Sequence, residues 1–577
     1  MEREMKMRVE ADWFVKDKTS AAEGIRKAIA CAKETGAREI HFSRGEYLLT
    51  DAVTIQTKSI AHDDGCGDLH EKDCYLVLAD VQNLKLVGEM NEDGSPATCL
   101  TGCHPYLIQS LYPSILWAER GTGITIENLA FRRTPATVCG GVVEQVEEDC
   151  ICVRPFPGLE TQEEMGAYCM NRFDLKSGAL LGESLTFGFG FDQRWKRRSD
   201  GCLLLRDGEL ARKVKAGEGL SFHAAGKTDF LIFFGEISDL TMINVSVYNT
   251  NSFALLTENC CHIRAEKLCI RPEKGQLFTG PRDGWKVYRC SGKILLDRCH
   301  FEGLRMDAQN VHSNYLIADR TADERTLLCT CKYAPIALKA GTEVRIHGRD
   351  GIWHNRIKAW RVAGGRMEES VQSENKSAGQ AAAGTENHIT CYQIEFEDAF
   401  GDGILSGTLI EPLCWEPESY TCTNSVFRNI AGAGNLIRCG NVRIENNCYE
   451  NLMNAGVLIG AEFDTHCESG HGHGILIRNN HFKNIGFKPR YGEYGCGCIA
   501  VKSQGFEGPF NSQITIEGNC FEDSGRAIEL NDCREVEIKN NVYTGISRRL
   551  TINEKTVDTE SIRADVPWEG VKGDTQR

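Results

Sequence analysis

The chain has 577 residues, too many for one compact core, so we expect either several domains or one elongated repeat architecture. Its 41% hydrophobic and 25% charged residues are typical of an ordinary globular protein. The net charge of -15 argues against nucleic acid or an anionic membrane as the main partner, because phosphate binding needs a basic stripe, and it weakly disfavours a polyanionic glycan.

The N-terminal sequence MEREMKMRVEADWF has no apolar core of a signal peptide, and no long apolar run follows, so we predict a cytoplasmic protein without a membrane span. The 27 cysteines are scattered, and several, such as Cys299 and Cys448, lie in apolar strand contexts. Free thiols are therefore expected. The paired CxxC spacing of a zinc site is not found, so we predict no metal and no cofactor.

Residues 1–50 predict an N-terminal cap followed by the first strands. Ser20 and Glu23 form the capping-box pattern at the start of an amphipathic helix, and Gly36 is the expected end. Such a helix would cover the open end of a solenoid.

A short repeat is the most informative feature of the chain. An alternating apolar segment is followed by Asn and then by an aromatic residue, and neighbouring copies lie roughly 22 to 39 residues apart, the range for one solenoid coil. We expect the Asn side chains to stack at a bend and bond turn backbone. The clear copies are Ile124–Phe131, Val442–Tyr449, Ile475–Phe482, Ile514–Phe521 and Val536–Tyr543, with looser ones at 240–248, 263–270 and 294–301.

Two interruptions of the repeat are rich in strand-forming residues and predict inserted small β-barrels. The predicted fold class is therefore all-β, a parallel β-helix with an N-terminal capping helix and two inserted barrels. The predicted boundaries are 1–50 for the cap and first strands, 51–145, 231–316 and 401–548 for the β-helix, 146–230 and 317–400 for the barrels, and 549–577 for a C-terminal tail.

Two aspartates lie one coil apart within the segment 281–316. Asp283 and Asp307 occupy comparable places before their strands, so they should lie on the same face of the β-helix. Glycoside hydrolysis requires two carboxyl groups on either side of one bond. Asn310 and His312 follow at alternating spacing as candidate substrate-binding residues, and Trp285 is a candidate aromatic platform for a sugar.

The same segment resembles glycoside hydrolase family 110, the inverting α-galactosidases that act on α-1,3-linked galactose. The resemblance rests on the ordered residues Asp283, Cys290, Gly292, Ile294, Cys299, Phe301–Gly303, Asp307, Ala308 and Asn310–His312, and on the stretch 441–480 with Glu468, Ser469 and Gly470. It covers the chain distantly from about residue 20 to 545.

The resemblance implies a right-handed β-helix with two inserted barrels and an exo-acting, inverting enzyme that removes α-linked galactose from an oligosaccharide. Asp283 and Asp307 would be the catalytic carboxylates. Asn310, His312 and Glu468 would line the pocket, and Glu462 is a secondary binding candidate. Met306 departs from the family pattern, which has a further Asp there, and the segment Asp283-Gly-Trp-Lys departs from the family's His and Thr.

Three other interpretations stay open. Gly470–Gly474 (GHGHG) and Asn249–Asn251 are similar to polygalacturonase motifs, although the Arg-x-Lys that grips a uronate is missing. The acid-rich segment His62–Asp68 could hold calcium in a lyase of the same fold. The third is a non-catalytic, glycan-binding solenoid. A homo-oligomer also stays open.

Overall fold

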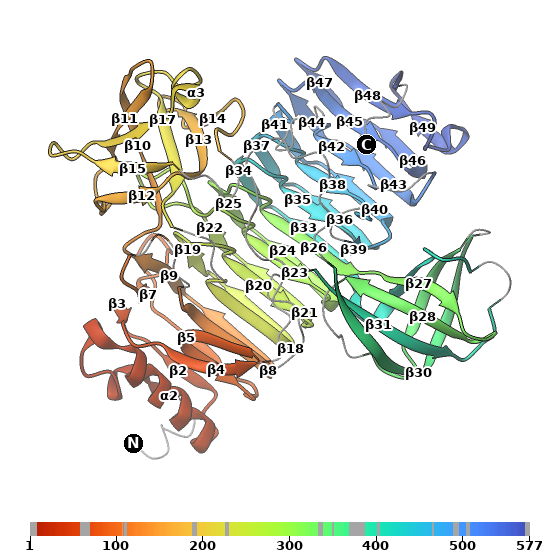
Figure 1. Ribbon diagram of the computed structural model, residues 1–577, viewed down its shortest axis with the longest axis horizontal. Helices are drawn as coiled ribbons and strands as arrows, with labels where there is room; N and C mark the ends of the chain where they lie inside the picture. Colours follow the sequence, from red (N-terminus) through yellow and green to blue (C-terminus); the bar gives the residue numbers. More distant parts are fainter. Residues whose placement is uncertain are drawn as a thin grey trace.

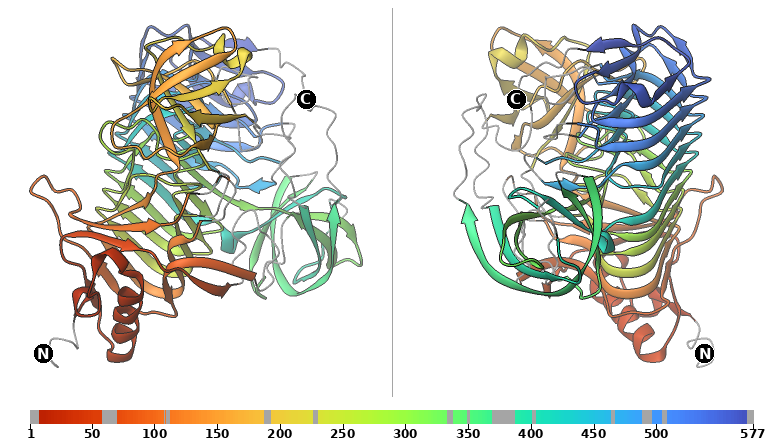
Figure 2. Two further views of the ribbon diagram at one scale, coloured as in Figure 1. Left: turned by 60° about the vertical axis from the view of Figure 1, so that its left-hand side comes forward. Right: turned by 90° about the vertical axis from the view of Figure 1, so that its right-hand side faces the viewer.

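The computed structural model describes residues 8–57, 70–106, 108, 112–186, 193–225, 230–332, 338–348, 351–368, 387–400, 404–463, 467–487, 496–503 and 508–571. Most of them belong to one elongated solenoid of parallel strands, from which two β-rich modules project (Figure 1). The strands are stacked from the N-terminal to the C-terminal end, and one module stands out at the side (Figure 2).

One coil consists of three short strands that lie on three faces. The chain runs through β23 (Trp285–Tyr288) on face 1, β24 (Ser291–Asp297) on face 2 and β25 (His300–Glu302) on face 3. It then returns to face 1 as β26 (Gln309–Asn314), which pairs with β23 in parallel, Trp285 opposite Gln309. This succession repeats along the chain, so the predicted parallel β-helix is confirmed; its handedness stays a prediction.

The faces contain the following strands. Face 1 holds β20 (Leu255–Glu258), β23, β26, β35 (Asn435–Ile437), β38 (Val457–Ile459), β42 (Ile499–Val501), β45 (Arg526–Leu530) and β48 (Arg548–Asn553). Face 2 holds β21 (Cys261–Glu266), β24, β33 (Pro417–Thr423), β36 (Val442–Glu445), β40 (His473–Arg478), β43 (Asn511–Glu517), β46 (Cys533–Lys539) and β49 (Ile562–Ala564).

Face 3 holds β3 (Gly45–Leu49), β7 (Thr98–Cys103), β9 (Leu129–Thr134), β19 (Ser246–Val247), β22 (Cys269–Ile270), β25, β34 (Val426–Ile430), β37 (Cys448–Leu452), β41 (His481–Ile485), β44 (Cys520–Glu522) and β47 (Val542–Thr544). In the early coils, β8 (Ser114–Glu127) and β18 (Ile232–Ile243) are long enough to span faces 1 and 2, and they pair with each other in parallel.

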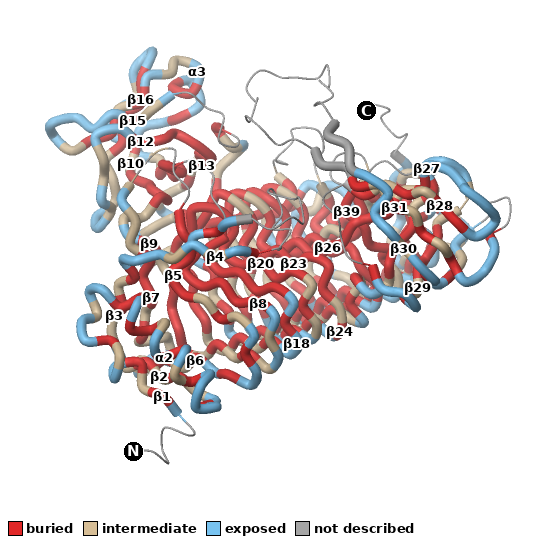
Figure 3. Tube along the Cα trace, turned by 60° about the horizontal axis from the view of Figure 1, so that its bottom comes forward, coloured by how far each residue is buried: buried red, intermediate tan, exposed pale blue. Residues whose placement is uncertain are grey.

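The interior of the solenoid is apolar and continuous, as the buried residues along its strands show (Figure 3). Alternating residues of each strand point inward because successive side chains of a strand face opposite sides. The aromatic residue of the repeat forms a stack inside: neighbouring rings are nearly parallel, with centroids 4.7–5.4 Å apart, along Phe301, Phe427, Tyr449, Phe482, Phe521 and Tyr543.

The asparagines of the repeat form a ladder at the bend between faces 2 and 3. The Asn480 Oδ1 atom accepts hydrogen bonds from the backbone N–H and the side-chain amide of Asn447, at 2.9 and 3.0 Å. Asn480 in turn donates to Asn519 in the same way, and Asn519 to Asn541. The predicted stacking is confirmed.

A helix, α2 (Ala22–Thr35), lies at the N-terminal end of the solenoid (Figure 1). Its buried residues Ile25 and Ile29 join the solenoid core, and Gly36 ends it in the left-handed conformation, φ 70°. The predicted capping box is wrong: Ala21 is the N-cap, and the Ser20 hydroxyl contacts Thr50 instead. The role of α2 as a cap stays a prediction.

The first module lies between β9 and β18 and forms an antiparallel sheet of eight strands. Its order is β12 (Glu164–Gly166), β15 (Arg194–Arg197), β16 (Leu203–Arg206), β11 (Cys150–Pro155), β10 (Val138–Val146), β17 (Gly219–His223), β13 (Tyr168–Asp174) and β14 (Ala179–Leu181), with the short helix α3 (Gly208–Ala211). The predicted start at residue 146 falls at the end of β10, and the barrel form of this module stays a prediction.

The second module lies between β26 and β33 and is a closed six-stranded barrel. Its strands follow the order β27 (Leu316–Thr321), β28 (Thr326–Lys332), β31 (Asn387–Phe396), β30 (Gly351–Glu368), β29 (Glu343–Gly348) and β32 (Leu409–Pro412). It has its own apolar core, which includes Leu327, Ile346 and Ile394.

The predicted C-terminal tail contains further solenoid strands. β49 pairs in parallel with β46, and β50 (Glu569–Val571) pairs in parallel with β48, so the stack continues past residue 548. The cysteines within the described residues are unpaired thiols, as expected. No helix in the described ranges is long and apolar enough to cross a membrane.

Candidate active site

Asp283 and Asp307 lie on neighbouring rungs, each two residues before its face 1 strand. The Asp283 Oδ1 atom accepts a hydrogen bond from the backbone N–H of Asp307 at 3.3 Å. The Asp307 Oδ1 atom accepts one from the backbone N–H of Ala433, on the next rung, at 2.7 Å. Both side chains are buried. The structure therefore brings the two predicted carboxylates together, one above the other.

The rung beyond Asp307 leaves room for its carboxylate because residue 432 is glycine. A Cβ atom at Gly432 would lie 2.5 Å from the Asp307 Oδ1 atom and 2.4 Å from the Met306 carbonyl carbon, closer than real Cβ atoms come. Met306 itself is half-buried and brings no acid to this turn.

A cluster of buried polar side chains lies on the outer side of face 1, next to the two aspartates. Trp285 and Val287 of β23 point into the core, so Lys286 and Tyr288 between and after them point outward. Lys286 lies opposite Asn310 of β26, and Tyr288 lies opposite His312. Lys286, Asn310 and His312 expose only 2%, 6% and 4% of their surface, which is unusual for outward-facing polar residues.

Glu468 is the centre of this cluster. Its strand β39 (Glu468–Ser469) pairs antiparallel with the end of β26, Glu468 opposite Asn314. The carboxylate forms an ion pair with Arg438, and its Oε1 atom lies 3.4 Å from His312 Nε2 and 3.8 Å from Lys286 Nζ. Arg438 also donates to the Asn310 Oδ1 atom at 3.1 Å.

Burial controls the charge of the cluster. It lowers the pKa of Lys286 to about 8, although Glu468 and Asp283 act in the opposite direction. It also lowers the pKa of His312 well below the usual value, so this imidazole is neutral. The Nδ1 atom of His312 lies 2.9 Å from the Ser313 carbonyl oxygen and therefore carries the proton. The Nε2 atom is then an acceptor, and it has no hydrogen-bond partner.

The barrel forms a wall beside this cluster. Arg345 of β29 pairs with Glu411 and Glu416 at 2.9 Å each, and His347 lies 2.7 Å from Glu411. Burial alone would raise the pKa of Glu411, but His347 and Arg345 hold it well below its usual value. A small cavity joins this wall to the cluster and is lined by Ser313, Glu411, Pro412, Trp415, Glu416, Arg438, Ser469 and Gly470.

The structure places most of the predicted site residues at this cluster and corrects one. Trp285 is wrong as a sugar platform, because its ring is fully buried among the core residues and its Nε1 atom donates to Thr257 at 3.2 Å. Glu462 lies beside Glu468, and its backbone N–H donates to the Glu468 carbonyl at 3.0 Å.

Lys286 and Arg438 were missed from the sequence. Aligning the face 1 strands would have found Arg438, since it occupies the rung position of Tyr288 and His312.

The motifs behind the other interpretations lie elsewhere or are engaged. His471 and His473 of the GHGHG segment hydrogen-bond to backbone carbonyls of Phe510 and His471, at 2.8 and 3.0 Å. The calcium-site segment His62–Asp68 lies outside the described residues. In the described ranges, the groups close enough to share a cation are His481, Cys520 and Glu522 on face 3, and Glu147, Asp149 and Cys150 in the first module. Neither includes a residue of the cluster.

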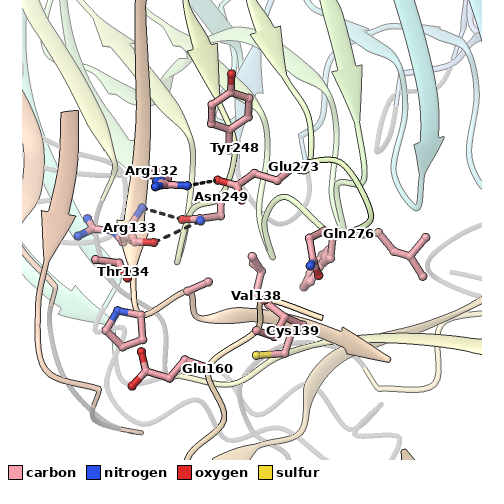
Figure 4. A pocket seen from close by; sticks show the side chains of 16 residues that line it. Arg132, Arg133, Thr134, Val138, Cys139, Glu160, Tyr248, Asn249, Glu273 and Gln276 are labelled. Carbon is pink, nitrogen blue, oxygen red and sulfur yellow. Dashed lines mark hydrogen bonds and ion pairs between the residues drawn. The ribbon is translucent and has the colours of Figure 1, made fainter. Parts of the chain in front are cut away.

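A cavity of ≈ 250 Å³ lies between face 3 and the first module, away from the cluster (Figure 4). Several of its charged and amide groups have partners, whereas the Nε and Nη1 atoms of the buried Arg133 have none among the described residues. Arg132 pairs with Glu273 at 2.8 Å, and the Asn249 side chain bonds both backbone atoms of Arg133. This cavity is therefore the junction of two packed bodies, and it lacks stacked carboxylates.

Comparison with known proteins finds alpha-1,3-galactosidases among the relatives, although no family model matches. Alpha-1,3-galactosidase B of Phocaeicola vulgatus is 28% identical over 261 residues, which are 44% of this chain and 41% of the relative. Alpha-1,3-galactosidase B of Bacteroides fragilis is 23% identical over 512 residues, 81% of this chain and 78% of the relative. The distant resemblance to glycoside hydrolase family 110 is confirmed. The Phocaeicola match spans about two-fifths of that relative's length.

Solved structures with similar chains include a polygalacturonase from Erwinia carotovora, at 10% identity and a TM-score of 0.37, covering 96% of this chain and 95% of that one. An exopolygalacturonase from Thermotoga maritima has a TM-score of 0.39 at 10% identity, covering 98% and 95%.

Proposed function

We propose that this protein is an exo-acting glycoside hydrolase that removes a terminal α-linked galactose from an oligosaccharide, with Asp283 and Asp307 as its catalytic carboxylates. The observation that carries the proposal is the pair of stacked, buried carboxylates beside a buried polar cluster on one outer face. Two carboxyl groups at one bond are what glycoside hydrolysis needs. The similarity to proteins named alpha-1,3-galactosidase supports galactose as the sugar.

The surroundings of the two aspartates suggest different roles. Asp283 is one of the two acids that favour the charged form of Lys286, so the ammonium in turn favours a charged Asp283. We therefore assign Asp283 as the base that activates water and Asp307 as the acid that protonates the leaving oxygen. His312, Asn310 and Arg438 would hold the sugar hydroxyls.

We propose an inverting mechanism, in line with the family resemblance. Equivalent backbone positions on neighbouring rungs are about 4.7–4.9 Å apart. Inversion needs carboxyl groups about 6.5–9.5 Å apart, so the side chains must diverge from the stack, whereas about 5–5.5 Å would suit retention. The anomer of the first product distinguishes these mechanisms.

The free thiols support the predicted cytoplasmic location, because reducing compartments keep thiols free. Short imported oligosaccharides would then be the substrates.

The test is a substrate panel with proton NMR detection. It contains disaccharides with α-1,3-, α-1,4- and α-1,6-linked galactose, and polygalacturonate, with Asp307→Asn prepared in parallel to exclude a contaminating enzyme. We expect β-galactose as the first product from the α-1,3-linked substrate. First release of α-galactose would overturn inversion alone. Turnover of polygalacturonate only, or binding without turnover of any substrate, would overturn the proposed function.

A further inference from the structure

Lys286 is a buried cation whose ammonium group has no hydrogen-bond acceptor among the residues that the structure describes. It exposes 2% of its surface, and the hydrogen bonds of the described residues include none from its ammonium group. The nearest carboxylate oxygen, Glu468 Oε1, lies 3.8 Å away, which is beyond hydrogen-bonding distance. An ammonium group has three donors, and burying them without acceptors is costly.

The cluster does not need Lys286 to neutralise Glu468. Arg438 already pairs with that carboxylate, while Arg438 also holds Asn310. On its other sides the ammonium faces two aromatic rings, with centroids of Phe253 and Tyr288 both 5.8 Å away. These contacts shield the charge and supply no oxygen to bond. A structural role therefore leaves the position of Lys286 unexplained.

The charges that face Lys286 balance one another. Asp283 and Glu468 act on it as anions, and Arg282 and Arg438 act as cations. Lys286 itself, the neutral His312 and Asp307, which carries a proton when it acts as the acid, complete the set.

An acceptor without a partner lies in the same cluster. The Nε2 atom of the neutral His312 has no hydrogen-bond partner, and it contacts the Glu468 carboxylate that Lys286 also faces. A donor and an acceptor that both lack partners fit a sugar hydroxyl, which can accept from one and donate to the other.

We propose that Lys286 is a specificity-determining residue that donates hydrogen bonds to hydroxyl oxygens of a neutral terminal sugar. This inference rests on the proposed function, because it assigns the sugar-binding position of that same site.

The test compares wild type with Lys286→Met and, as a matched control, Lys293→Met, which removes an exposed lysine of face 2. Each protein is assayed on an α-1,3-linked galactose disaccharide and on analogues that lack one hydroxyl each. We expect Lys286→Met to lower kcat/KM about 10- to 100-fold, with Lys293→Met unchanged. One deoxy analogue should cost wild type a similar factor and cost Lys286→Met nothing. Equal losses of kcat/KM on that deoxy analogue in wild type and both variants would contradict the proposed hydrogen bond between Lys286 and the sugar.

Thermal unfolding separates a ligand role from a structural one. If Lys286 serves the ligand, Lys286→Met unfolds at the wild-type temperature or above, because an unbonded buried charge is removed. A clear fall would show that the lysine holds the fold together and would overturn the inference.

Binding provides a readout that does not depend on turnover. We expect galactose to raise the unfolding temperature of wild type more than that of Lys286→Met. Equal shifts in the two proteins, no shift with any sugar, or a wild-type shift with galacturonate alone would contradict the inference. Absence of hydrolysis together with the expected galactose shift would refute the proposed reaction and leave the role of Lys286 intact.

Discussion

Two of the regions in which the solenoid buries polar side chains differ in how those side chains are hydrogen-bonded. At the bend between faces 2 and 3, each inner asparagine of the ladder bonds the backbone and amide of its neighbours. On the outer side of face 1, the described part of the chain offers no hydrogen-bond acceptor to the Lys286 ammonium and no hydrogen-bond partner to the His312 Nε2 atom.

The difference separates structure from function. A buried polar group with all its hydrogen bonds made stabilises the fold, whereas one without partners lowers stability. The ladder recurs on successive coils, as a structural device should. The cluster occurs beside the two stacked aspartates, which is where a substrate would supply the absent partners.

The largest effect on stability is expected in the ladder. Asn480→Ala removes the acceptor of two Asn447 donors and the donor to the Ile444 carbonyl. At roughly 1 kcal/mol or more for each orphaned group, we expect a loss of about 3 kcal/mol. Calorimetry of thermal unfolding measures it. An unchanged unfolding temperature would refute the structural role of the ladder.

The second-largest expected effect on stability depends on pH and arises from Lys286 in the buried polar cluster of face 1. The pKa of Lys286 falls from 10.5 in the unfolded chain to about 8 in the folded one. Between these values the unfolded chain binds more protons, so this group makes stability rise from pH 8 to 10.5. The difference of about 2.5 pKa units corresponds to roughly 3 kcal/mol at most. Unfolding of wild type and Lys286→Met across this range should differ in slope; identical slopes would contradict a buried, unbonded ammonium.

The smallest effect is expected where polar groups are exposed. On the barrel, Lys358 Nζ lies 2.6 Å from Glu395 Oε1, and 56% and 39% of the two side chains are exposed. Water and salt screen such a pair, so Glu395→Gln should change stability by less than about 0.5 kcal/mol and leave activity unchanged. If Glu395→Gln lost as much stability as Asn480→Ala, burial would not explain why polar groups in the two places differ in their contribution to stability.

The repeat made the solenoid predictable, because each coil repeats the same alternation, asparagine and aromatic residue. The regular spacing of asparagine and aromatic residues in the repeat predicts both the ladder from Asn447 to Asn541 and the stack of aromatic rings. The predicted start of the first module at residue 146 lies at the end of β10, which begins at Val138. The sequence pattern predicts Ser20 as the N-cap residue of α2, whereas the structure has Ala21 at that position. The N-cap depends on how the preceding chain approaches the helix, which the pattern does not show.

The aspartate pair was predictable from coil spacing, but its neighbours were only partly so. Trp285 was assigned to the sugar because aromatic rings bind sugars, yet its alternation with Val287 places it in the core. Glu468 reaches the cluster through a short antiparallel strand outside the repeat, and the family resemblance alone indicated it. The sequence does not single out Lys286, because the burial of a lysine side chain cannot be predicted from the residue type alone.

The most direct test of the account measures activity and unfolding together for wild type, Asp283→Asn, Asp307→Asn and Asn480→Ala on an α-1,3-linked galactose disaccharide. We expect each aspartate variant to lose about 10²- to 10⁴-fold in kcat while keeping a nearly wild-type unfolding temperature. Asn480→Ala should unfold earlier and keep its activity per folded molecule. Aspartate variants that retain the wild-type rate would contradict the central claim that these stacked carboxylates perform the chemistry.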